Sequence, residues 1–325
     1  MSVSVKLGND TLTGVDSVRL EDATSAGNYI TFSLTSLPST PTDAVIFYSL
    51  EPFTMKTNNN AKNWNGTLYY STDYSTWNTW AGTNTLTAVQ SDGYYKLYVR
   101  GSGNTYLTTG ASSSTARWVF AGAGIKCYGN MNTLLSYTSP PISLTANYTF
   151  AYLFYQCSNV SFDVVLPATT LTEYCYYYMF ASCTSLTTAP ELPATTLTNY
   201  CYYYMFYNCT SLTTAPKIKA TAFVSGATYS CGSMLYGCTS LVSLPALAPT
   251  TLTNYCYRYM FYGCTNIKLS TTQTGEYQTA YRIPTSGTGS AGTNSLQNMF
   301  TSTGGTLTGT PSINTTYYTS NTVVS

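Results

Sequence analysis

The sequence predicts a multidomain chain in which an N-terminal β segment and a β-sandwich lead into an α/β solenoid with a C-terminal cap. The main observation is a phrase, T-T-L-T-x-Y-C-Y-Y-Y-M-F-x-x-C-T-S-L-T-T-A-P, that recurs almost verbatim between residues 148 and 264. A fixed period of this kind is typical of stacked supersecondary units. One slot of the phrase falls, at spacings of 26 residues except for one of 29, on Leu153, Met179, Met205, Met234 and Met260.

Each repeat contains two recognisable parts. Segments such as Ser185–Pro190 and Ser211–Pro216 are short, rich in Thr and ended by proline, which predicts a brief parallel strand. After the L-P-A-T-T-L turn, Thr198 or Asn199 is placed to cap a helix of about ten residues. The sequence therefore predicts alternating strand and helix along the array.

The predicted helix has one apolar face. Cys175, Met179 and Cys183 are four residues apart, and this spacing places them on the same side of a helix. Tyr178 and Phe180 flank that side. Tyr174, Tyr177 and position 181 are expected to point away from it.

The repeated M-F-x-x-C-T-S-L-T-T-A-P-x-L-P phrase resembles the BspA-like leucine-rich repeat, a variant solenoid found in bacterial surface proteins and in phages of gut Bacteroidales. The resemblance covers roughly residues 134–264 and implies a leucine-rich-repeat solenoid over residues 125–276. The third unit departs from the phrase because Lys217–Ser230 holds a three-residue insertion. We expect a bulged loop there.

Residues 1–40 contain short alternating runs, at Val3–Leu7, Ser17–Leu20 and Tyr29–Leu34, with too few apolar residues for a core of their own. The segment resembles the N-terminal anchoring segments of phage fibre and decoration proteins, which implies phage capsid or tail proteins as partners. The alternative is an ordinary first hairpin of the next domain.

Residues 41–124 read as a β-sandwich because β-rich runs alternate with turns rich in Asn, Gly, Ser and Asp. The section resembles an immunoglobulin-like module, with Tyr69–Asp73 followed by Trp77 in the expected place. Trp77, Trp80 and Trp118 are candidate ligand platforms, but core packing is the expected use of at least two of them.

The apolar ends of a repeat array must be shielded from water by capping segments. Asn130–Leu135 is predicted to form a short capping helix before the first repeat. Residues 277–325 are predicted to cap the other end, where Leu296–Phe300 echoes the repeat and Thr303 replaces its cysteine.

Composition excludes several function classes. Charged residues are only 8% of the chain and the net charge is +1, which argues against nucleic acid as a partner. The N-terminus lacks a secretory signal pattern, and no run of 18 apolar residues predicts a membrane span. A polar, weakly charged surface suits an extracellular or virion protein.

The sequence offers few residues of the kinds that usually carry catalysis. There is no histidine, so the usual Ser-His and Cys-His pairs are excluded. Glu173 and Glu191 occupy variable slots of the repeat, where solvated side chains are expected rather than a catalytic pair. We expect no enzyme and no cofactor.

The ten cysteines are expected to be buried free thiols. Cys175 and Cys183 are about 12 Å apart on the predicted helix, too far for a disulfide. A bond between equivalent cysteines of adjacent repeats would need unusually close helices. Zinc is the other alternative, but it is discounted because the chain has no histidine and no C-x-x-C pair.

Tyrosine is the candidate binding residue, because its rigid, half-polar ring stacks on sugars and donates hydrogen bonds. Tyr174 recurs at the same slot in every repeat, and either a binding ladder or packing between repeats explains it. Slots that vary between repeats are typical of recognition surfaces or of drift. The candidate glycan-binding residues are Tyr177, Tyr203, Arg258, Tyr207, Tyr236 and Tyr262.

The function that these observations predict is a non-enzymatic phage virion protein, a head fibre, decoration or tail-fibre component that adheres to host or mucus glycans. Residues 1–40 would anchor it in the particle, and analogy with fibres implies a homotrimer. A bacterial cell-surface adhesin that binds host proteins is the alternative. A glycan-processing enzyme is a third reading, which would need a carboxylate pair that the sequence does not offer.

Overall fold

The computed structural model describes residues 41–108, 110 and 117–325, together with four two-residue strands near the N-terminus. These strands are β1 (Lys6–Leu7), β2 (Asp10–Thr11), β3 (Arg19–Leu20) and β4 (Phe32–Ser33). β1 pairs with β2 and β3 with β4, both antiparallel. The predicted anchoring role of residues 1–40 otherwise lies outside the described residues.

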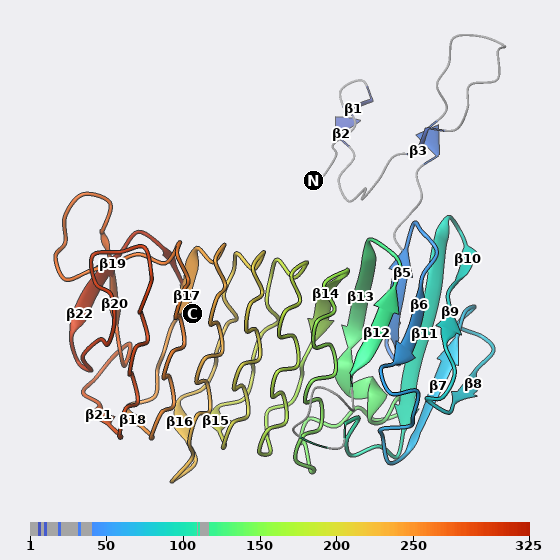
Figure 1. Ribbon diagram of the computed structural model, residues 1–325, viewed down its shortest axis with the longest axis horizontal. Helices are drawn as coiled ribbons and strands as arrows, with labels where there is room; N and C mark the ends of the chain where they lie inside the picture. Colours follow the sequence, from blue (N-terminus) through green and yellow to red (C-terminus); the bar gives the residue numbers. More distant parts are fainter. Residues whose placement is uncertain are drawn as a thin grey trace.

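Two sheets pack face to face at the sandwich end of the molecule (Figure 1). The larger has the order β14-β13-β5-β11-β7-β8, and β10 pairs with β11. Its strands are β5 (Val45–Ser49), β7 (Thr67–Ser71), β8 (Asn78–Trp80), β10 (Val89–Ser91), β11 (Tyr94–Ser102), β13 (Ile125–Asn130) and β14 (Val160–Val165). The smaller has the order β12-β6-β9, formed by β6 (Thr54–Thr57), β9 (Leu86–Thr87) and β12 (Trp118–Ala121).

The alternating strands put their apolar side chains between the sheets. Phe47 of β5 lies 5.0 Å from Phe120 and 6.2 Å from Trp118, measured between ring centroids. Trp80 and Trp118 are each 1% exposed, so core packing of two of the three candidate tryptophans is confirmed. Trp77 is half-buried.

Arg100 of β11 joins the sandwich to the chain that leads into the repeats. Its guanidinium lies 3.8 Å from the ring centroid of Trp77 and 4.0 Å from that of Tyr137, and it forms a 2.7 Å ion pair with Asp43. Tyr74 donates a hydrogen bond to the same carboxylate. Four separated parts of the chain therefore meet at one cation.

The larger sheet runs on into the first repeat. β13 pairs antiparallel with β5 on one side and parallel with β14 on the other, from Ile125 opposite Val160 to Asn130 opposite Val165. One hydrophobic core extends from Val45 in the sandwich to Tyr317 near the C-terminus. The sandwich and the repeats thus share both a sheet and a core.

Residues 173–183 do not form the predicted α-helix, and in the described part of the chain the one helix is the 3-10 helix η1 (Met131–Leu134). Backbone N–H groups donate to the next repeat: Tyr176 to the carbonyl of Cys201 (3.1 Å) and Phe180 to that of Met205 (3.0 Å). Intervening N–H groups close turns onto the carbonyl three residues back. Each repeat is therefore a run of turns hydrogen-bonded to its neighbours, drawn in Figure 1 as stacked coils.

The backbone of this run is left-handed at every fourth residue. The φ angles of Tyr174, Tyr178 and Ser182 are 58°, 52° and 59°, values that an α-helix excludes. Tyr, Cys and Phe are also weak helix formers, so the bonds between repeats decide the backbone. The slot of Ser182 holds residues that tolerate this conformation, including Asn208, Gly237 and Gly263.

The predicted core residues are confirmed, although the backbone that carries them differs from the predicted helix. Cys175, Met179 and Cys183 are all fully buried, because a turn that repeats every four residues buries the same positions as a helix. Ala181 is also fully buried, against the prediction that it points outward. Tyr174 and Tyr177 are half-buried.

The predicted parallel strands are reduced to short contacts. Ser185–Pro190 pairs with the next repeat through one parallel bridge, between Thr188 and Thr214. β15 (Thr196–Leu197) pairs parallel with β16 (Ala222–Phe223). The insertion of the third unit forms an exposed turn after β16, closed by a hydrogen bond from the Ala227 N–H to the Val224 carbonyl (2.9 Å).

The C-terminal section closes the array at the end opposite the sandwich (Figure 1). It contributes β20 (Thr279–Arg282), β21 (Ser290–Ala291), β22 (Thr316–Thr319) and β23 (Thr322–Val324). The last repeats contribute β17 (Ser243–Pro245), β18 (Thr251–Leu252) and β19 (Leu269–Ser270). The order β19-β22-β20 makes an antiparallel sheet, and β21 and β23 pair back onto β18 and β17. Phe300 stacks on Phe261 (5.3 Å, 6°), so the expected echo of the repeat in this section is confirmed.

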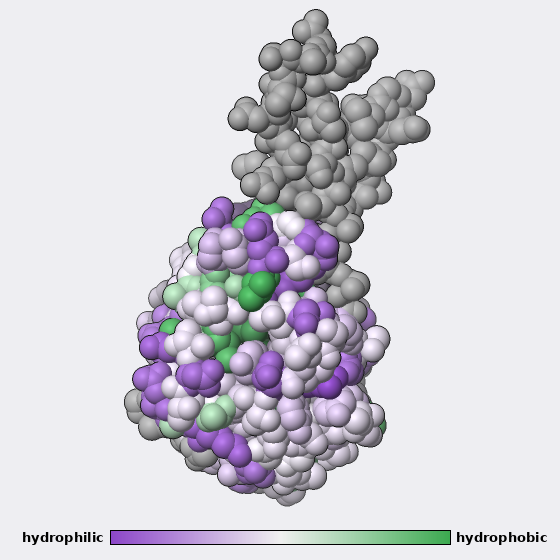
Figure 2. Space-filling model, turned by 90° about the vertical axis from the view of Figure 1, so that its right-hand side faces the viewer, coloured by the Kyte–Doolittle hydropathy of each residue, from purple (hydrophilic) through white to green (hydrophobic). Residues whose placement is uncertain are grey.

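The helix predicted at Asn130–Leu135 is present as η1, and the Asn130 side chain caps it by accepting a 2.9 Å hydrogen bond from the Asn132 N–H. No helix among the described residues is long and apolar enough to cross a membrane. The face shown in Figure 2 is mostly pale, with strongly polar residues in separate spots and a small apolar area. This face fits the expected polar, weakly charged surface.

Candidate binding surface

Tyrosines at one slot of the repeat stack ring on ring along the array. Their successive centroids lie 4.7, 4.6, 5.2 and 4.7 Å apart, at interplanar angles of 19°, 6°, 13° and 7°. The spacing is close to the roughly 4.7–4.9 Å between hydrogen-bonded strands, so the backbone bonds between repeats set it. The rings are Tyr148, Tyr174, Tyr200, Tyr229 and Tyr255. Packing between repeats therefore explains this recurrent slot.

A second ladder lies beside the first, at Tyr152, Tyr178 and Tyr204. Its centroids are 5.0 and 4.5 Å apart. From the sequence, Tyr178 is expected at the flank of the core, and its slot is not among the predicted binding residues. The Tyr-Tyr-Tyr run that recurs at residues 176–178 and 202–204 was the available signal.

The candidate residues Tyr177 and Tyr203 stack on each other at 5.8 Å and 17°. Each also contacts the second ladder, Tyr177 at 4.7 Å from Tyr178 and Tyr203 at 4.2 Å from Tyr204. These two candidates are thus brought together.

The candidates Tyr207, Tyr236 and Tyr262 form a further ladder, with centroids 5.1 and 4.6 Å apart. Tyr207 lies 5.2 Å from Tyr204, so this ladder meets the second one. The connected rings, half-buried except for the buried Tyr152, form one surface, which we call the tyrosine face. It comprises Tyr148, Tyr152, Tyr155, Tyr174, Tyr177, Tyr178, Tyr200, Tyr203, Tyr204, Tyr207, Tyr229, Tyr236, Tyr255, Tyr259 and Tyr262.

The sixth candidate, Arg258, lies where two ladders are interrupted by small residues, Gly232 and Ser233. A Cβ on Gly232 would lie 3.1 Å from the ring of Tyr203, which leans into this gap. Arg258 donates to the hydroxyls of Tyr229 (3.2 Å) and Tyr259 (3.4 Å). Its guanidinium also lies 4.7 Å from the Tyr259 ring centroid.

Most ring faces on the tyrosine face are covered by neighbouring rings. Centroid separations near 5 Å leave no room for a sugar between two tyrosines. The predicted stacking of sugars on ring faces is therefore not available inside the ladders. Ring edges and hydroxyl groups remain for contacts with a ligand.

Burial raises the pKa of several phenols of the tyrosine face. Burial, with Tyr200 and Tyr148 nearby, raises the pKa of Tyr174 to about 12. Burial likewise raises the pKa of Tyr177 and Tyr203 above the usual value of 10.0. The pKa of Tyr259 is lowered instead, by hydrogen bonds from Asn298 and Arg258. The tyrosine face thus presents neutral hydroxyls that both donate and accept.

The repeat interior holds the cysteines, and all ten are buried free thiols, as predicted. At one slot the thiol donates to a carbonyl of the preceding repeat, as Cys183 does to Phe154 and Cys209 to Phe180, both at 3.1 Å. Burial raises the pKa of Cys209 to about 12. These thiols act as core residues that satisfy backbone carbonyls.

The two carboxylates considered for catalysis have separate partners. Glu173 accepts a 2.8 Å hydrogen bond from the Asn199 side-chain amide. Glu191 forms an ion pair with Lys219, and both side chains are about half exposed. This agrees with the reading of Glu191 as solvated.

Comparison with known proteins gives no similar one: the chain matches no family model, no curated protein and no solved structure.

Proposed function

We propose that this chain is a non-enzymatic adhesion protein that presents the tyrosine face to glycans of a host cell or of mucus. The observation that carries the proposal is the continuity of that face, where half-buried phenols of successive repeats are held at a fixed spacing by backbone hydrogen bonds. Preorganised tyrosines bind with little loss of side-chain entropy. The low charge of the chain suits neutral, hydroxyl-rich ligands.

The biological setting that we propose is a phage virion, with the protein as a head fibre, decoration or tail-fibre component. The proposal rests on the resemblance of the repeat phrase to BspA-like repeats, from which we infer that the array is a leucine-rich-repeat solenoid of unusual backbone. Residues 1–40 would bind capsid or tail proteins, and three copies would form the fibre.

The glycan part is tested with the full-length chain on an array of mucin-type oligosaccharides. Replacing both Tyr177 and Tyr203 by alanine removes a stacked pair and should weaken binding by about tenfold or more in Kd. Tyr318→Ala is the matched control, since it removes a half-buried tyrosine on β22 outside the tyrosine face. Equal binding by the double variant and the control would refute the role of this face.

The setting is tested by purifying the particle that contains the chain from its natural source. Capsid or tail proteins in fixed stoichiometry would support a virion component. A bacterial membrane fraction without them would support the alternative, a cell-surface adhesin for host proteins.

A further inference from the structure

The larger sheet has an outward face that the tyrosine face does not include, and two concavities lie on it. One of about 350 Å³ is lined by Tyr48, Ser49, Leu50, Glu51, Tyr94, Ala123, Gly124 and Lys126. The other, of about 440 Å³, is lined by Lys126, Tyr128, Ser161, Phe162, Asp163, Val164, Thr187, Thr188, Ala189 and Pro190. Lys126 lines both, so the two concavities are neighbours, and together we call them the junction groove.

Strand register explains why these side chains meet. Lys126 of β13 is opposite Tyr48 of β5 on one side and Ser161 of β14 on the other. Two residues along β13, Tyr128 is opposite Asp163 of β14. Alternation puts all of them on the outward face, because the residues between them point into the core. The junction groove therefore exists only because the sheet of the sandwich continues into the first repeat.

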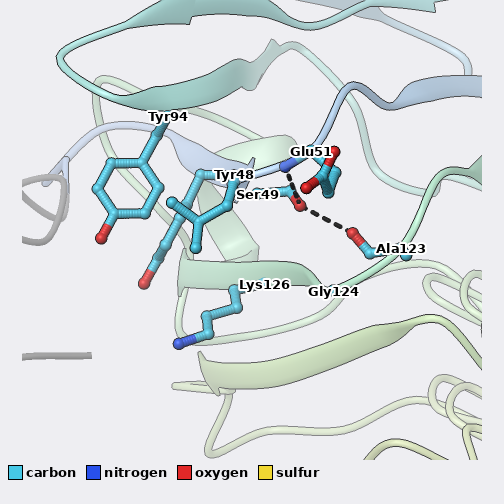
Figure 3. Close-up of a pocket in the computed structure, with 8 residues that line it drawn as sticks. Tyr48, Ser49, Glu51, Tyr94, Ala123, Gly124 and Lys126 are labelled. Carbon is cyan, nitrogen blue, oxygen red and sulfur yellow. Dashed lines mark hydrogen bonds between the residues drawn. The ribbon is translucent and has the colours of Figure 1, made fainter. Parts of the chain in front are cut away.

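The first concavity has a fixed rim. The Ser49 hydroxyl donates to the Ala123 carbonyl (2.8 Å) and accepts from the Glu51 N–H (3.1 Å), so it ties two turns together. Figure 3 shows the Tyr48 and Tyr94 hydroxyls and the Lys126 ammonium directed toward the same side of this space. Polar groups are thus already gathered before a ligand arrives.

The second concavity has an aromatic wall surrounded by hydroxyls. Tyr128 is half-buried and packs one ring face on Tyr48, with centroids 5.4 Å apart and an interplanar angle of 29°. Thr187 and Thr188 are exposed hydroxyl residues of the next repeat, and Asp163 is an exposed carboxylate. A ring beside hydroxyl and carboxylate groups suits a sugar, whose faces are apolar and whose rim is hydroxyl.

We propose that the junction groove is a second binding site, which takes a neutral oligosaccharide lying across β5, β13 and β14. Tyr128 packs against a sugar ring, Asp163 accepts hydrogen bonds from sugar hydroxyls, and Lys126 donates to the sugar next along. The described lining carries two carboxylates, Glu51 and Asp163, against one ammonium. Anionic sugars are repelled by this balance, so sialylated and sulfated chains bind less well.

The test uses the full-length chain and three probes: an N-acetyllactosamine tetrasaccharide, its sialylated form and its sulfated form, titrated by calorimetry. Asp163→Asn and Tyr128→Ala should each weaken binding of the neutral tetrasaccharide by about tenfold in Kd. Glu276 is an exposed carboxylate outside the junction groove, paired with Lys268 (3.2 Å). Glu276→Gln and Tyr318→Ala are therefore the matched controls and should leave Kd unchanged. Far-UV circular dichroism of each variant checks that the sheet is intact.

The outcomes separate this site from the tyrosine face. Loss of affinity only in the two groove variants supports the junction groove, and loss only in the Tyr177 and Tyr203 double variant overturns it. Tighter binding of the sialylated or sulfated probe overturns the proposed charge preference. Failure of all three probes to bind overturns the junction groove, while binding of other glycans on the array would leave the tyrosine face standing.

Discussion

Replacing Ser182 by glycine should raise the free energy of unfolding if the repeat is a run of turns, and lower it if the repeat is a helix. Ser182 has a φ of 59°, in the left-handed region. This conformation strains a residue with a side chain by roughly 1–2 kcal/mol. Glycine has no such strain, but folding costs it roughly 0.5–1 kcal/mol more in backbone entropy. The free energy of unfolding should therefore rise by about 0.5–1 kcal/mol.

In a helix the same change would destabilise the chain by about 0.5 kcal/mol, since glycine is the poorer helix former. The repeat itself supports the first result, because Gly237 and Gly263 occupy the same slot with φ of 71° and 72°. Ser182→Val gives a second contrast: a β-branched residue is costly at positive φ, yet it is nearly equal to serine in a helix.

The measurement is a urea titration of the full-length chain followed by far-UV circular dichroism, with midpoints compared at equal slope. Thr184→Gly is the matched control, because Thr184 is exposed and is not among the positive-φ residues of the repeat. That control should lower the midpoint. If Ser182→Gly lowered it by as much as Thr184→Gly does, the turn-based backbone would be wrong.

Three further predictions concern the core and the junction. Phe180→Ala removes a ring stacked between two phenylalanines, with ring centroids 5.7 Å away on each side. It should lower the free energy of unfolding, measured by urea titration, by about 3–5 kcal/mol. Phe180→Leu introduces the residue that Leu235 has at the same slot, and should lower it by less than about 2 kcal/mol. Burial raises the pKa of the Cys209 thiol from 9.0 to about 12, so the thiol ionises more readily in the unfolded chain than in the folded one. The free energy of unfolding, measured against pH, should therefore fall from about pH 9 toward pH 12. A thiol reagent should label Cys209 only in denaturant. Arg100→Gln breaks the Asp43 ion pair and the stacking on two rings, and should cost about 1–2 kcal/mol, measured by urea titration against Lys62→Gln.

The burial pattern of the repeats could be predicted from the sequence, but their backbone could not. Cys175, Met179 and Cys183 are core residues in either conformation, since spacing by four residues fits both a helix and a run of turns. The difference lies in where N–H groups find acceptors, and those acceptors belong to the next repeat. A residue type that tolerates positive φ, recurring at the slot of Ser182, was the local signal that argued against a helix.

One part of the candidate binding surface could likewise be predicted from the sequence and another part could not. The recurrence of tyrosine at the slots of Tyr174 and Tyr207 predicts ladders, and the ladders are present. The junction groove needs Lys126 to lie between Tyr48 and Ser161, and this depends on β13 pairing with strands far away in the sequence. Only the tertiary pairing brings these residues together.

Replacing tyrosine by phenylalanine distinguishes the two proposed sites by their mode of contact. On the tyrosine face the ring faces are largely covered, so hydroxyls must carry much of the binding, and Tyr177→Phe with Tyr203→Phe should weaken glycan binding about as much as the alanine pair. In the junction groove the ring of Tyr128 is the contact, so Tyr128→Phe should keep affinity within about threefold while Tyr128→Ala loses about tenfold.

The measurement is the same calorimetric titration, run on each phenylalanine and alanine variant. Full affinity in the phenylalanine pair on the tyrosine face would mean that its rings, not its hydroxyls, contact the sugar. A loss in Tyr128→Phe equal to that in Tyr128→Ala would mean that the groove uses the hydroxyl, which would contradict ring packing against the sugar.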